Sequence, residues 1–301
     1  MSYKDFIHLH NHTEYSMLDS ICKYKDMIAK AKELNMPALA MTDHANMYAT
    51  LRFYKECKEQ GIKPIIGCEI YTTKDVNEKI RDNFHLILLA KNNIGYHNLI
   101  RIVSESSEHL YYKFRVDRNI IRRYSEGLIC LTACRAGEIQ RHLLSGEYEK
   151  AKTVAEEYID IFGKDDFYME VQHHNLPNDS FLCKEQFRLA EELGIKVVAT
   201  NDIHYLNKED AEVQDVIYCI KQDKKIDEKP RLKLETNEFY FKSQEEMYEV
   251  FKDYKNCLSN TKEIADKCHV EIEFKMNLTP QYPDIPDGMD ETSYLRKLCD
   301  D

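Results

Sequence analysis

The sequence predicts an α/β fold in which parallel strands alternate with helices. Short apolar runs recur over the first two hundred residues, and amphipathic segments of ten or more residues separate them. A parallel pair of strands needs a crossover of about a dozen residues, usually a helix, which these segments supply. With at least six such units, a closed or distorted barrel and an open sheet both fit the pattern.

Six apolar runs have the length and composition of buried strands. The first, at residues 37–41, contains Pro-Ala-Leu-Ala-Met, and the others have a similar character. The expected strands are residues 37–41, 64–66, 86–90, 128–131, 167–171 and 197–199.

Five segments between these runs have the apolar periodicity of helices. Met27, Ile28, Ala31 and Leu34 would share one face of the first. Glycine follows two of the segments directly, as is common after the last turn of a helix. The expected helices are residues 23–34, 49–60 before Gly61, 94–109, 148–162 and 179–193 before Gly194.

The last third of the chain has a different character. From about Tyr205 onward the sequence is rich in charge and poor in strand-like runs, which predicts a mainly helical extension. Residues 275–287 contain Pro280, Pro283 and Pro286 and favour an extended linker.

The expected domain boundaries follow from this change. Residues 1–274 form one domain, with a barrel over 1–205 and the extension over 206–274. Residues 275–301 form the linker and the start of a following domain, because residues 291–298 begin a helix that the chain scarcely completes.

Composition excludes several classes of protein. The chain has 301 residues, 43% of them hydrophobic, which suffices for one large domain or two smaller ones. Its net charge of -11 disfavours a broad DNA-wrapping surface, because such affinity comes from neutralising many phosphates. The sequence has no Gly-rich phosphate loop and no Cys-x-x-Cys pair. It also lacks a secretory signal and a membrane-length apolar run, so we expect free thiols, a cytoplasmic location and no membrane partner.

Three histidines, His8, His10 and His12, stand at alternate positions near the N-terminus. In a strand, alternate residues project from one face, so two or three imidazoles would lie within reach of one metal ion. Three histidines at a period of two are hard to explain by packing alone. They are the first indication of metal chemistry in this sequence.

Further ligand-type residues follow the opening histidines and the expected strands. In parallel α/β folds the loops after the strands gather on one face, and sites are built there. His85 is an exception, because it begins its apolar run instead of following it. The residues that fit the rule are Asp19, Asp43, His44, Glu69, Cys134, Asp202 and His204.

Each of these residues also has a plain structural interpretation. Asp19 would serve as a helix cap, Asp43 as a brace for its loop, and Cys134 as a small buried side chain. Together, however, histidines, carboxylates and one thiolate suit Zn, Mn or Fe better than Ca or Mg. The set is too large for one tetrahedral site and indicates two or three divalent ions. Such clusters activate water and hold the oxygens of a phosphoester during in-line displacement.

These motifs resemble those of the PHP (polymerase and histidinol phosphatase) domain family, most closely the PHP domains of bacterial DNA polymerase III alpha subunits. The residues that carry the resemblance are His10-Asn11-His12-Thr13, Thr42-Asp43-His44, Glu69, His85, Cys134 and Asp202-Ile203-His204. The closer match extends over residues 6–19, 61–69, 93–99, 126–131 and 198–204.

The resemblance implies a distorted (β/α)7 barrel of the PHP type and a site of nine ligands for three metals. Glu69 matches the bridging carboxylate. His8 is then an extra histidine that supports the ligands from outside, as does Asp43. The remaining ligands are His10 and His12 beside Asp202, then Asp19, His44 and His204 for one metal, and His85 and Cys134 for the second.

Two activities are implied by the resemblance. The whole subunit is a DNA-directed DNA polymerase of replication, and metal-complete PHP domains resemble metal-dependent 3′–5′ exonucleases that proofread DNA ends. The palm aspartates of this family lie beyond residue 301, so this chain should not polymerise DNA. The implied partners are a DNA 3′ end, the remaining polymerase domains, the sliding clamp and a separate proofreading subunit.

The favoured hypothesis is phosphodiester hydrolysis, in which a hydroxide between two ions bridged by Glu69 attacks the terminal phosphodiester of a DNA 3′ end. Two other interpretations stay open. One is hydrolysis of a small phosphomonoester, as in histidinol phosphatases. The other is a metal-stabilised docking domain without activity.

A basic stretch offers one path for DNA to the site. Its cations alternate with aromatic residues between Tyr111 and Tyr124, a combination that suits single-stranded nucleic acid. The same stretch also fits a solvated basic surface or a contact with other polymerase domains. Its candidate DNA-binding residues are Lys113, Arg115, Arg118, Arg122 and Arg123.

Overall fold

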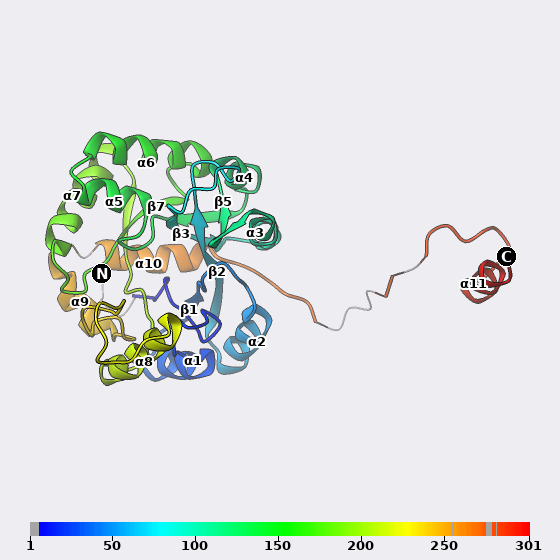
Figure 1. Cartoon of the computed structure of the whole chain (residues 1–301), viewed down its shortest axis with the longest axis horizontal. Helices are drawn as coiled ribbons and strands as arrows, with labels where there is room; N and C mark the ends of the chain where they lie inside the picture. The colour runs from blue at the N-terminus through cyan, green and yellow to red at the C-terminus, as the bar shows by residue number, and fades with distance from the viewer. Residues whose placement is uncertain (1–5, 255, 275–278, 281) are drawn as a thin grey trace. The chain divides into compact units, whose positions relative to one another are not determined.

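One curled eight-stranded sheet forms the centre of the protein (Figure 1). The computed structural model describes residues 6–254, 256–274, 279–280 and 282–301. In the sheet, β1 pairs with β2, and the remaining order is β4-β5-β2-β3-β6-β7-β8. The strands are β1 Ala38–Met41, β2 Lys63–Thr72, β3 Phe84–Ala90, β4 Leu110–Tyr111, β5 Lys113–Val116, β6 Leu128–Leu131, β7 Phe167–Val171 and β8 Lys196–Ala199.

An irregular segment over residues 7–12 closes the sheet into a barrel. On one side, the amide of Ala40 donates to the carbonyl of His8, and the amide of Thr42 donates to Asn11. On the other side, the segment exchanges two hydrogen bonds with Ile203, just after β8. The barrel therefore has seven members, this segment and the strands β1, β2, β3, β6, β7 and β8. This confirms the expected distorted barrel.

Strand β3 corrects the expectation of an all-parallel barrel. It runs antiparallel to both β2 and β6, while β1–β2, β6–β7 and β7–β8 are parallel. The beginning of β3 therefore lies at the same end of the barrel as the C-terminal ends of the other strands. This reversal explains why His85, at the start of its apolar run, reaches the same face as residues that follow their strands.

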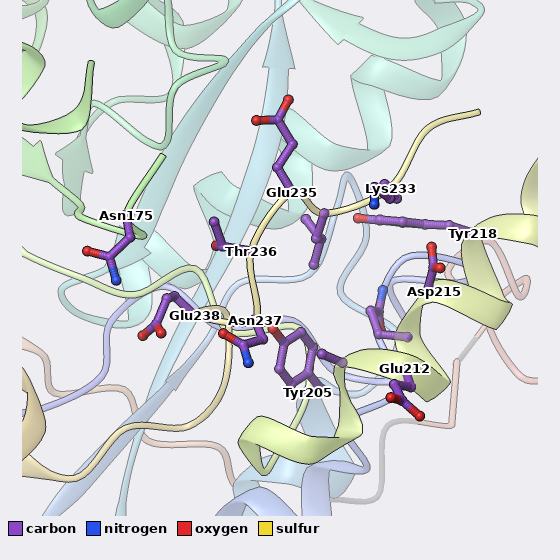
Figure 2. A pocket seen from close by; sticks show the side chains of 13 residues that line it. Asn175, Tyr205, Glu212, Asp215, Tyr218, Lys233, Glu235, Thr236, Asn237 and Glu238 are labelled. Carbon is purple, nitrogen blue, oxygen red and sulfur yellow. The ribbon is translucent and has the colours of Figure 1, made fainter. Parts of the chain in front are cut away.

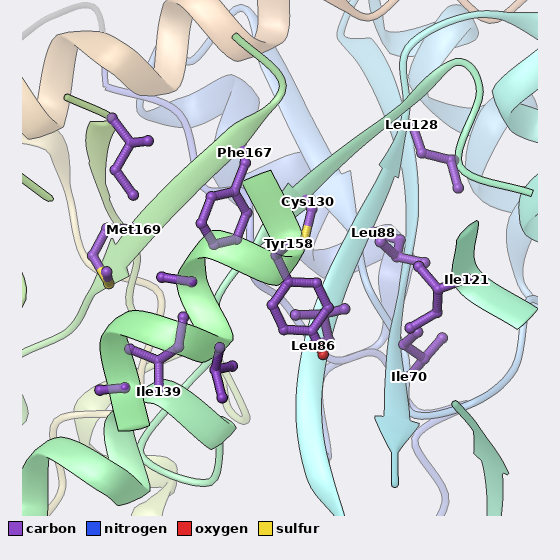
Figure 3. Packing of buried hydrophobic residues seen from close by; sticks show 14 of the residues in the cluster. Ile70, Leu86, Leu88, Ile121, Leu128, Cys130, Ile139, Tyr158, Phe167 and Met169 are labelled. Carbon is purple, nitrogen blue, oxygen red and sulfur yellow. The ribbon is translucent and has the colours of Figure 1, made fainter. Parts of the chain in front are cut away.

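The strand side chains alternate between two hydrophobic clusters. Ile87 and Leu89 of β3 pack inside the barrel with Ile129 and Leu131 of β6. The intervening residues point outward and pack against the helices that surround the barrel, as Figure 3 shows for Leu88, Cys130 and Tyr158. By the same alternation on β2, Glu69 points inward like Ile65, which brings a carboxylate into the barrel.

Eleven α-helices occur in the described part of the chain, and all five expected helices are among them. Gly61 and Gly194 end α2 and α7 in the left-handed conformation, as expected of them. The helices are α1 Tyr24–Glu33, α2 Thr50–Gln60, α3 Asn93–Ser106, α4 Arg118–Arg123, α5 Glu138–Leu144, α6 Tyr148–Phe162, α7 Asp179–Leu193, α8 Ala211–Gln222, α9 Gln244–Val250, α10 Asn256–Lys267 and α11 Glu291–Asp300. Three 3-10 turns, Ser107–His109, Lys208–Asp210 and Lys252–Tyr254, complete the helical structure.

The extension after β8 is helical, as predicted, and it packs closely on the barrel. Ile264 and Ala265 of α10 join the inner cluster, and Thr261 accepts a hydrogen bond from the amide of Ile7. Lys63, at the start of β2, donates to the carbonyl of Ala265. Helix α10 therefore closes the end of the barrel where the parallel strands begin, opposite the end that gathers the ligand residues.

The chain divides into two units, residues 1–270 and 271–301. In the second unit, α11 begins at a capping box formed by Asp290 and Ser293. Of the expected linker, residues 275–278 and 281 lie outside the described residues, and the assignment of a following domain stays a prediction.

Candidate metal centre

Glu69 lies at the middle of a cluster of histidines at the open end of the barrel. Its side chain is 1% exposed. Oε1 lies 2.8 Å from Nδ1 of His85, and Oε2 lies 2.8 Å from Nδ1 of His44 and 3.1 Å from Nε2 of His12. Oε1 is also 3.5 Å from Nε2 of His10. One carboxylate therefore reaches four imidazoles, and the bridging role of Glu69 stays a prediction.

His10, His12 and Asp202 form one potential metal-binding group around this carboxylate. Oδ1 of Asp202 lies 3.2 Å from Nε2 of both histidines, and the two Nε2 atoms are 3.3 Å apart. His10 and His12 are fully buried. The three ligand atoms thus converge on a space of the size that one ion would fill.

Asp19, His44 and His204 lie on the second side of the cluster. Oδ2 of Asp19 is 2.9 Å from Nε2 of His44, and the ring of His204 is tilted against that of His12 at 4.7 Å. His12, His44 and His204 have ligand atoms close enough to hold an ion together. Asp19 does not cap a helix here, because α1 begins at Tyr24 after Lys23.

His85 and Cys134 complete the cluster on its third side. Sγ of Cys134 is 3.5 Å from Nδ1 of His85 and 3.9 Å from Oε1 of Glu69. His44, Glu69 and His85 form a third potential ion-binding group. The fold therefore brings together all nine residues that the sequence indicated as ligands, although they span residues 10 to 204.

The hydrogen bonding of the cluster fits a cation. Nδ1 of His44, Oε2 of Glu69 and Oδ1 of Asp202 are buried, and although each lies within 3.2 Å of another ligand atom, none forms a hydrogen bond of good geometry with a described residue. Polar atoms buried in this way are rare, because each loses its water without compensation. Divalent ions in the groups to which these residues belong would satisfy the three atoms. The mixed set of imidazoles, carboxylates and one thiol suits a transition metal or zinc.

The electrostatics of the cluster also favour positive charge. Burial would raise the pKa of Glu69, but His85, His44 and His10 hold it well below its usual range. Burial opposes a charge on His44, yet Glu69 and Asp19 raise its pKa to about 10. Burial and the nearby Asp202 and Glu69 raise the pKa of the Cys134 thiol, so the thiolate needs a cation beside it. Without metal, the cluster must take up protons instead.

Unusual backbone conformations occur beside three of the ligands and at a fourth, Asp202. Leu18, Ala45, Ala133 and Asp202 have positive φ values of 58°, 49°, 64° and 46°. Residues other than glycine rarely adopt this region, and such positions concentrate at functional sites. At Ala133 the turn breaks the in–out alternation of β6, so that Cys134 reaches the cluster. The loops at this end of the barrel therefore adopt unusual backbone conformations at the ligands.

A buried glutamate behind the cluster was not predicted from the sequence. Glu170 lies on β7 and is fully buried, and its Oε1 is 2.7 Å from Nδ1 of His10. Gln172 and Thr200 donate to the same oxygen. The signal that could have revealed Glu170 is a single acid inside the apolar run Phe-Tyr-Met-Glu-Val.

Asp43 supports the cluster from outside, in agreement with its expected role. It accepts hydrogen bonds from the amide and hydroxyl of Thr13 and from the hydroxyl of Ser16, at 2.6, 2.7 and 2.7 Å. Oγ of Ser16 lies 3.0 Å from Nδ1 of His12. Asp43 thus fixes the loop after the opening histidines and orients His12 through Ser16.

His8 does not share the face of His10 and His12. Its Nε2 donates to the carbonyl of Lys242 at 2.8 Å, and its ring contacts Phe6 and Phe241. The expectation that His8 supports the ligands is therefore wrong, because the hydrogen bond of its side chain is with the extension. The reason is that residues 7–12 form no regular strand, so their side chains do not alternate strictly.

The basic stretch is mostly engaged elsewhere, which corrects the expected DNA path. Arg115 is 2% exposed and donates to the carbonyls of residues 76, 78 and 80. Arg118 pairs with Glu138 and Glu157. The exposed Arg122 and Arg123 of α4 form ion pairs with Asp160 and Glu105, respectively. Only Lys113 of this set lines a pocket at the cluster.

That pocket, which we call the rim pocket, has a volume of about 250 Å³ and includes the ligands Asp19 and His44 in its wall. Tyr71 of β2 also lines it, with its ring stacked on His44 at 5.6 Å. The remaining lining comes from loops 15–17 and 45–48, the β4–β5 hairpin and α8. The rim pocket therefore gives a ligand access to the side of the cluster formed by Asp19 and His44.

Comparison with known proteins agrees with this geometry. Residues 8–174 match the family model of the PHP domain. The DNA polymerase III alpha subunit of Borreliella burgdorferi is 45% identical over 291 residues, which cover 94% of this chain and 25% of that protein. Those of Helicobacter pylori and Treponema pallidum are 42% and 40% identical and cover 90% and 99% of this chain.

The chain spans about a quarter of the length of these curated relatives. In the described residues, no helix is both long and apolar enough to cross a membrane. The match begins at His8 and takes in most of the ligand cluster, and the relatives align with nearly all of the chain. The chain therefore belongs to the PHP domain family, and it is similar to the DNA polymerase III alpha subunits within that family.

Proposed function

We propose that this chain is a metal-dependent phosphoesterase that acts as a 3′–5′ exonuclease on DNA ends, as part of a polymerase III alpha-type replication subunit. The observation that carries the proposal is the cluster of nine ligands around Glu69, which opens on one side to the rim pocket. The similarity to DNA polymerase III alpha subunits supports DNA as the substrate. The proposed place of action is the cytoplasm, which suits ten cysteines that are all free.

The nine ligands would hold two or three ions, for which zinc, manganese and iron are the proposed identities. When bound, such ions lower the pKa of water and neutralise charge on phosphoester oxygens. The chain itself contributes preorganisation. Glu170 orients His10, and Asp43 with Ser16 orients His12, so the ligand atoms are placed before any ion arrives.

The proposed partners are a DNA 3′ end, the remaining polymerase domains and replisome subunits such as the sliding clamp. The relatives are named as polymerase subunits, which supports this setting. The chain carries no second cluster of three potential ligands among its described residues, so polymerisation would belong to other parts of the full subunit.

The test is metal analysis of the purified chain together with an exonuclease assay on a primer with a mismatched 3′ end. We expect bound metal and removal of the 3′ nucleotide with manganese or zinc, and we expect less bound metal and no removal in His12→Ala and Asp202→Ala variants. A small phosphomonoester tested in parallel should be hydrolysed far more slowly. Full nuclease rates in both variants would contradict the proposed site. Metal without any hydrolysis would favour a structural role.

A further inference from the structure

The rim pocket combines exposed aromatic rings with cations at the mouth of the ligand cluster. Tyr48 is 72% exposed and Tyr112 is 61% exposed, and both line this one pocket. Phe114 and Leu110, also exposed, add apolar surface from the same hairpin as Tyr112. Single exposed apolar side chains are ordinary, but a group of them around one opening marks a binding surface.

The backbone holds Tyr112 at the pocket in an unfavourable conformation. Tyr112 forms the turn between β4 and β5, and its φ is 61°, in a region that a tyrosine rarely adopts. The guanidinium of Arg81 packs against its ring at 3.8 Å from the centroid and donates to its hydroxyl. The ring is thus fixed in place while most of its surface remains open to a ligand.

Two lysines line the same pocket from different elements. Nζ of Lys113, on β5, lies 3.1 Å from the hydroxyl of Tyr71 and forms no ion pair with any described residue. Nζ of Lys221, on α8, lies 2.9 Å from Oδ1 of the ligand Asp19. Burial and the charge of Lys221 lower the pKa of Lys113. Two neighbouring ammonium groups, in a lining with Asp19 as its one acid, make this side of the pocket attractive to an anion.

The larger cavity beside α8 lacks this chemistry. It has a volume of about 500 Å³ and is lined by Tyr205, Tyr218 and Lys233, as Figure 2 shows. Four carboxylates, from Glu212, Asp215, Glu235 and Glu238, also line it, and none of the nine ligands does. Repulsion from these acids makes it a poor phosphate site, whereas the rim pocket has the ligands Asp19 and His44 in its own wall.

We propose that the rim pocket binds the last nucleotides of a single nucleic-acid strand, with Tyr48 and Tyr112 stacking on bases and Lys113 and Lys221 contacting phosphates. Aromatic platforms combined with a few cations are the general means by which proteins bind single strands without reading sequence. Such binding needs only a local positive site, which is compatible with the net charge of -11. The inference rests on the proposed function, because it supplies the route by which a strand end reaches the ligand cluster.

Binding can be measured apart from hydrolysis. The probe is a 5′-labelled ten-nucleotide oligothymidylate, and its fluorescence anisotropy is followed with the full chain in the presence of EDTA. Tyr48→Ala and Tyr112→Asn remove one ring each, and asparagine tolerates the positive φ at position 112. We expect each variant to raise the Kd at least about fivefold, the lower end for loss of one base–aromatic stack. Tyr112→Phe, which keeps the ring, should restore most of the affinity.

The phosphate contact has its own measurement. In Lys113→Gln, the slope of log K against log salt should fall by about 0.7, the value for one phosphate contact on a single strand. Matched controls come from α7, where Phe181 and Lys184 are exposed and outside the pocket lining. Phe181→Leu and Lys184→Gln should leave both the Kd and the slope within error of the wild type.

The outcomes separate the two proposals. If wild type does not bind the probe, or the pocket variants behave like the α7 controls, the inference is wrong. If they instead change only self-association, measured by light scattering, the rim pocket is a protein contact and the inference is also wrong. If the binding pattern holds but no metal restores hydrolysis of any phosphodiester, the pocket is supported and the proposed nuclease function fails.

Discussion

Nδ1 of His10 lies 2.7 Å from Oε1 of Glu170, and both side chains are fully buried. A carboxylate at this nitrogen fixes which ring nitrogen carries the proton, so Nε2 is left as the ligand atom toward Asp202 and Glu69. The pair thus joins a strand in the barrel wall to the ligand cluster. The other carboxylate oxygen of Glu170, Oε2, has no hydrogen-bond partner among the described residues.

Replacing this glutamate should weaken metal binding without removing a ligand. We expect Glu170→Ala to lower the affinity for the ion beside His10 by roughly 10–100-fold, the usual effect of losing such a supporting carboxylate. Isothermal titration of the metal-free chain with zinc or manganese measures the change. Glu192→Ala, at an exposed ion pair with Lys152, is the matched control and should bind as the wild type does. Equal affinity in Glu170→Ala would show that His10 is oriented by its packing alone.

The ligand cluster was largely predictable because its members are chemically distinctive and stand at strand ends. Carboxylates and histidines such as Asp202 and His204 follow an apolar run, where the topology gathers loops. Glu170 escaped prediction because it lies within a strand, where its direction depends on the barrel. His85 was identified as a ligand by resemblance, but its position became understandable only when β3 proved antiparallel.

The basic stretch shows the opposite limit. Composition counts the cations of residues 113–123 but does not say which way each side chain points. On β5, Arg115 turns inward to the carbonyls of residues 76, 78 and 80, while Lys113 reaches the rim pocket. Arg118 satisfies acids on α5 and α6. Only the tertiary structure distinguishes the cation that lines a pocket from those that form structural hydrogen bonds and ion pairs.

Removing metal should destabilise the chain. Asp19, Glu69 and Asp202 are buried or nearly so, and without ions their charge is balanced only by protonated histidines and, at Asp19, by Lys221. At metal concentrations about 100 times the Kd, binding contributes about 2.7 kcal/mol, or a melting shift of roughly 5–10 °C. Differential scanning fluorimetry with and without EDTA measures it. An Asp202→Ala variant should show a smaller shift, and an unchanged melting temperature in the wild type would contradict the prediction.

A close backbone contact fixes the start of α3. A Cβ atom added to Gly95 would lie 1.8 Å from the carbonyl oxygen of Gly127, just before β6. Gly95→Ala should therefore cost roughly 1–3 kcal/mol or more, because the backbone must move to relieve the overlap. Gly61→Ala is the control: its Cβ meets open space, and only the φ of 75° opposes it, at a cost of about 1 kcal/mol. Urea denaturation measures the free energy of unfolding of both variants, and Gly95→Ala should lose more of it than Gly61→Ala. Equal losses would argue against the close contact.

Acid should destabilise the protein through His174, whose ring is buried and stacked on Phe239 at 4.0 Å. Burial lowers the pKa of His174 to about 4, although its Nε2 bonds the carbonyl of Asn201. The unfolded chain, with a histidine pKa near 6.5, binds a proton between pH 6.5 and 4 that the folded chain does not. This contribution to stability is complete above pH 6.5 and is lost as the pH falls toward 4.

The magnitude and its test follow from the same linkage. Between pH 7.5 and 5, protonation of His174 in the unfolded chain should lower the free energy of unfolding by about 2 kcal/mol. In His174→Gln that loss should be absent, so the variant is less stable than the wild type at pH 7.5 but approaches it at pH 5. Urea denaturation at both pH values, with EDTA present, gives the gap in unfolding free energy between the wild type and His174→Gln at each pH. The contributions of the other titrating histidines cancel when the two gaps are compared. A constant gap between the two proteins at both pH values would mean that His174 does not remain neutral in the folded state, and the acid sensitivity would then belong to the ligand cluster.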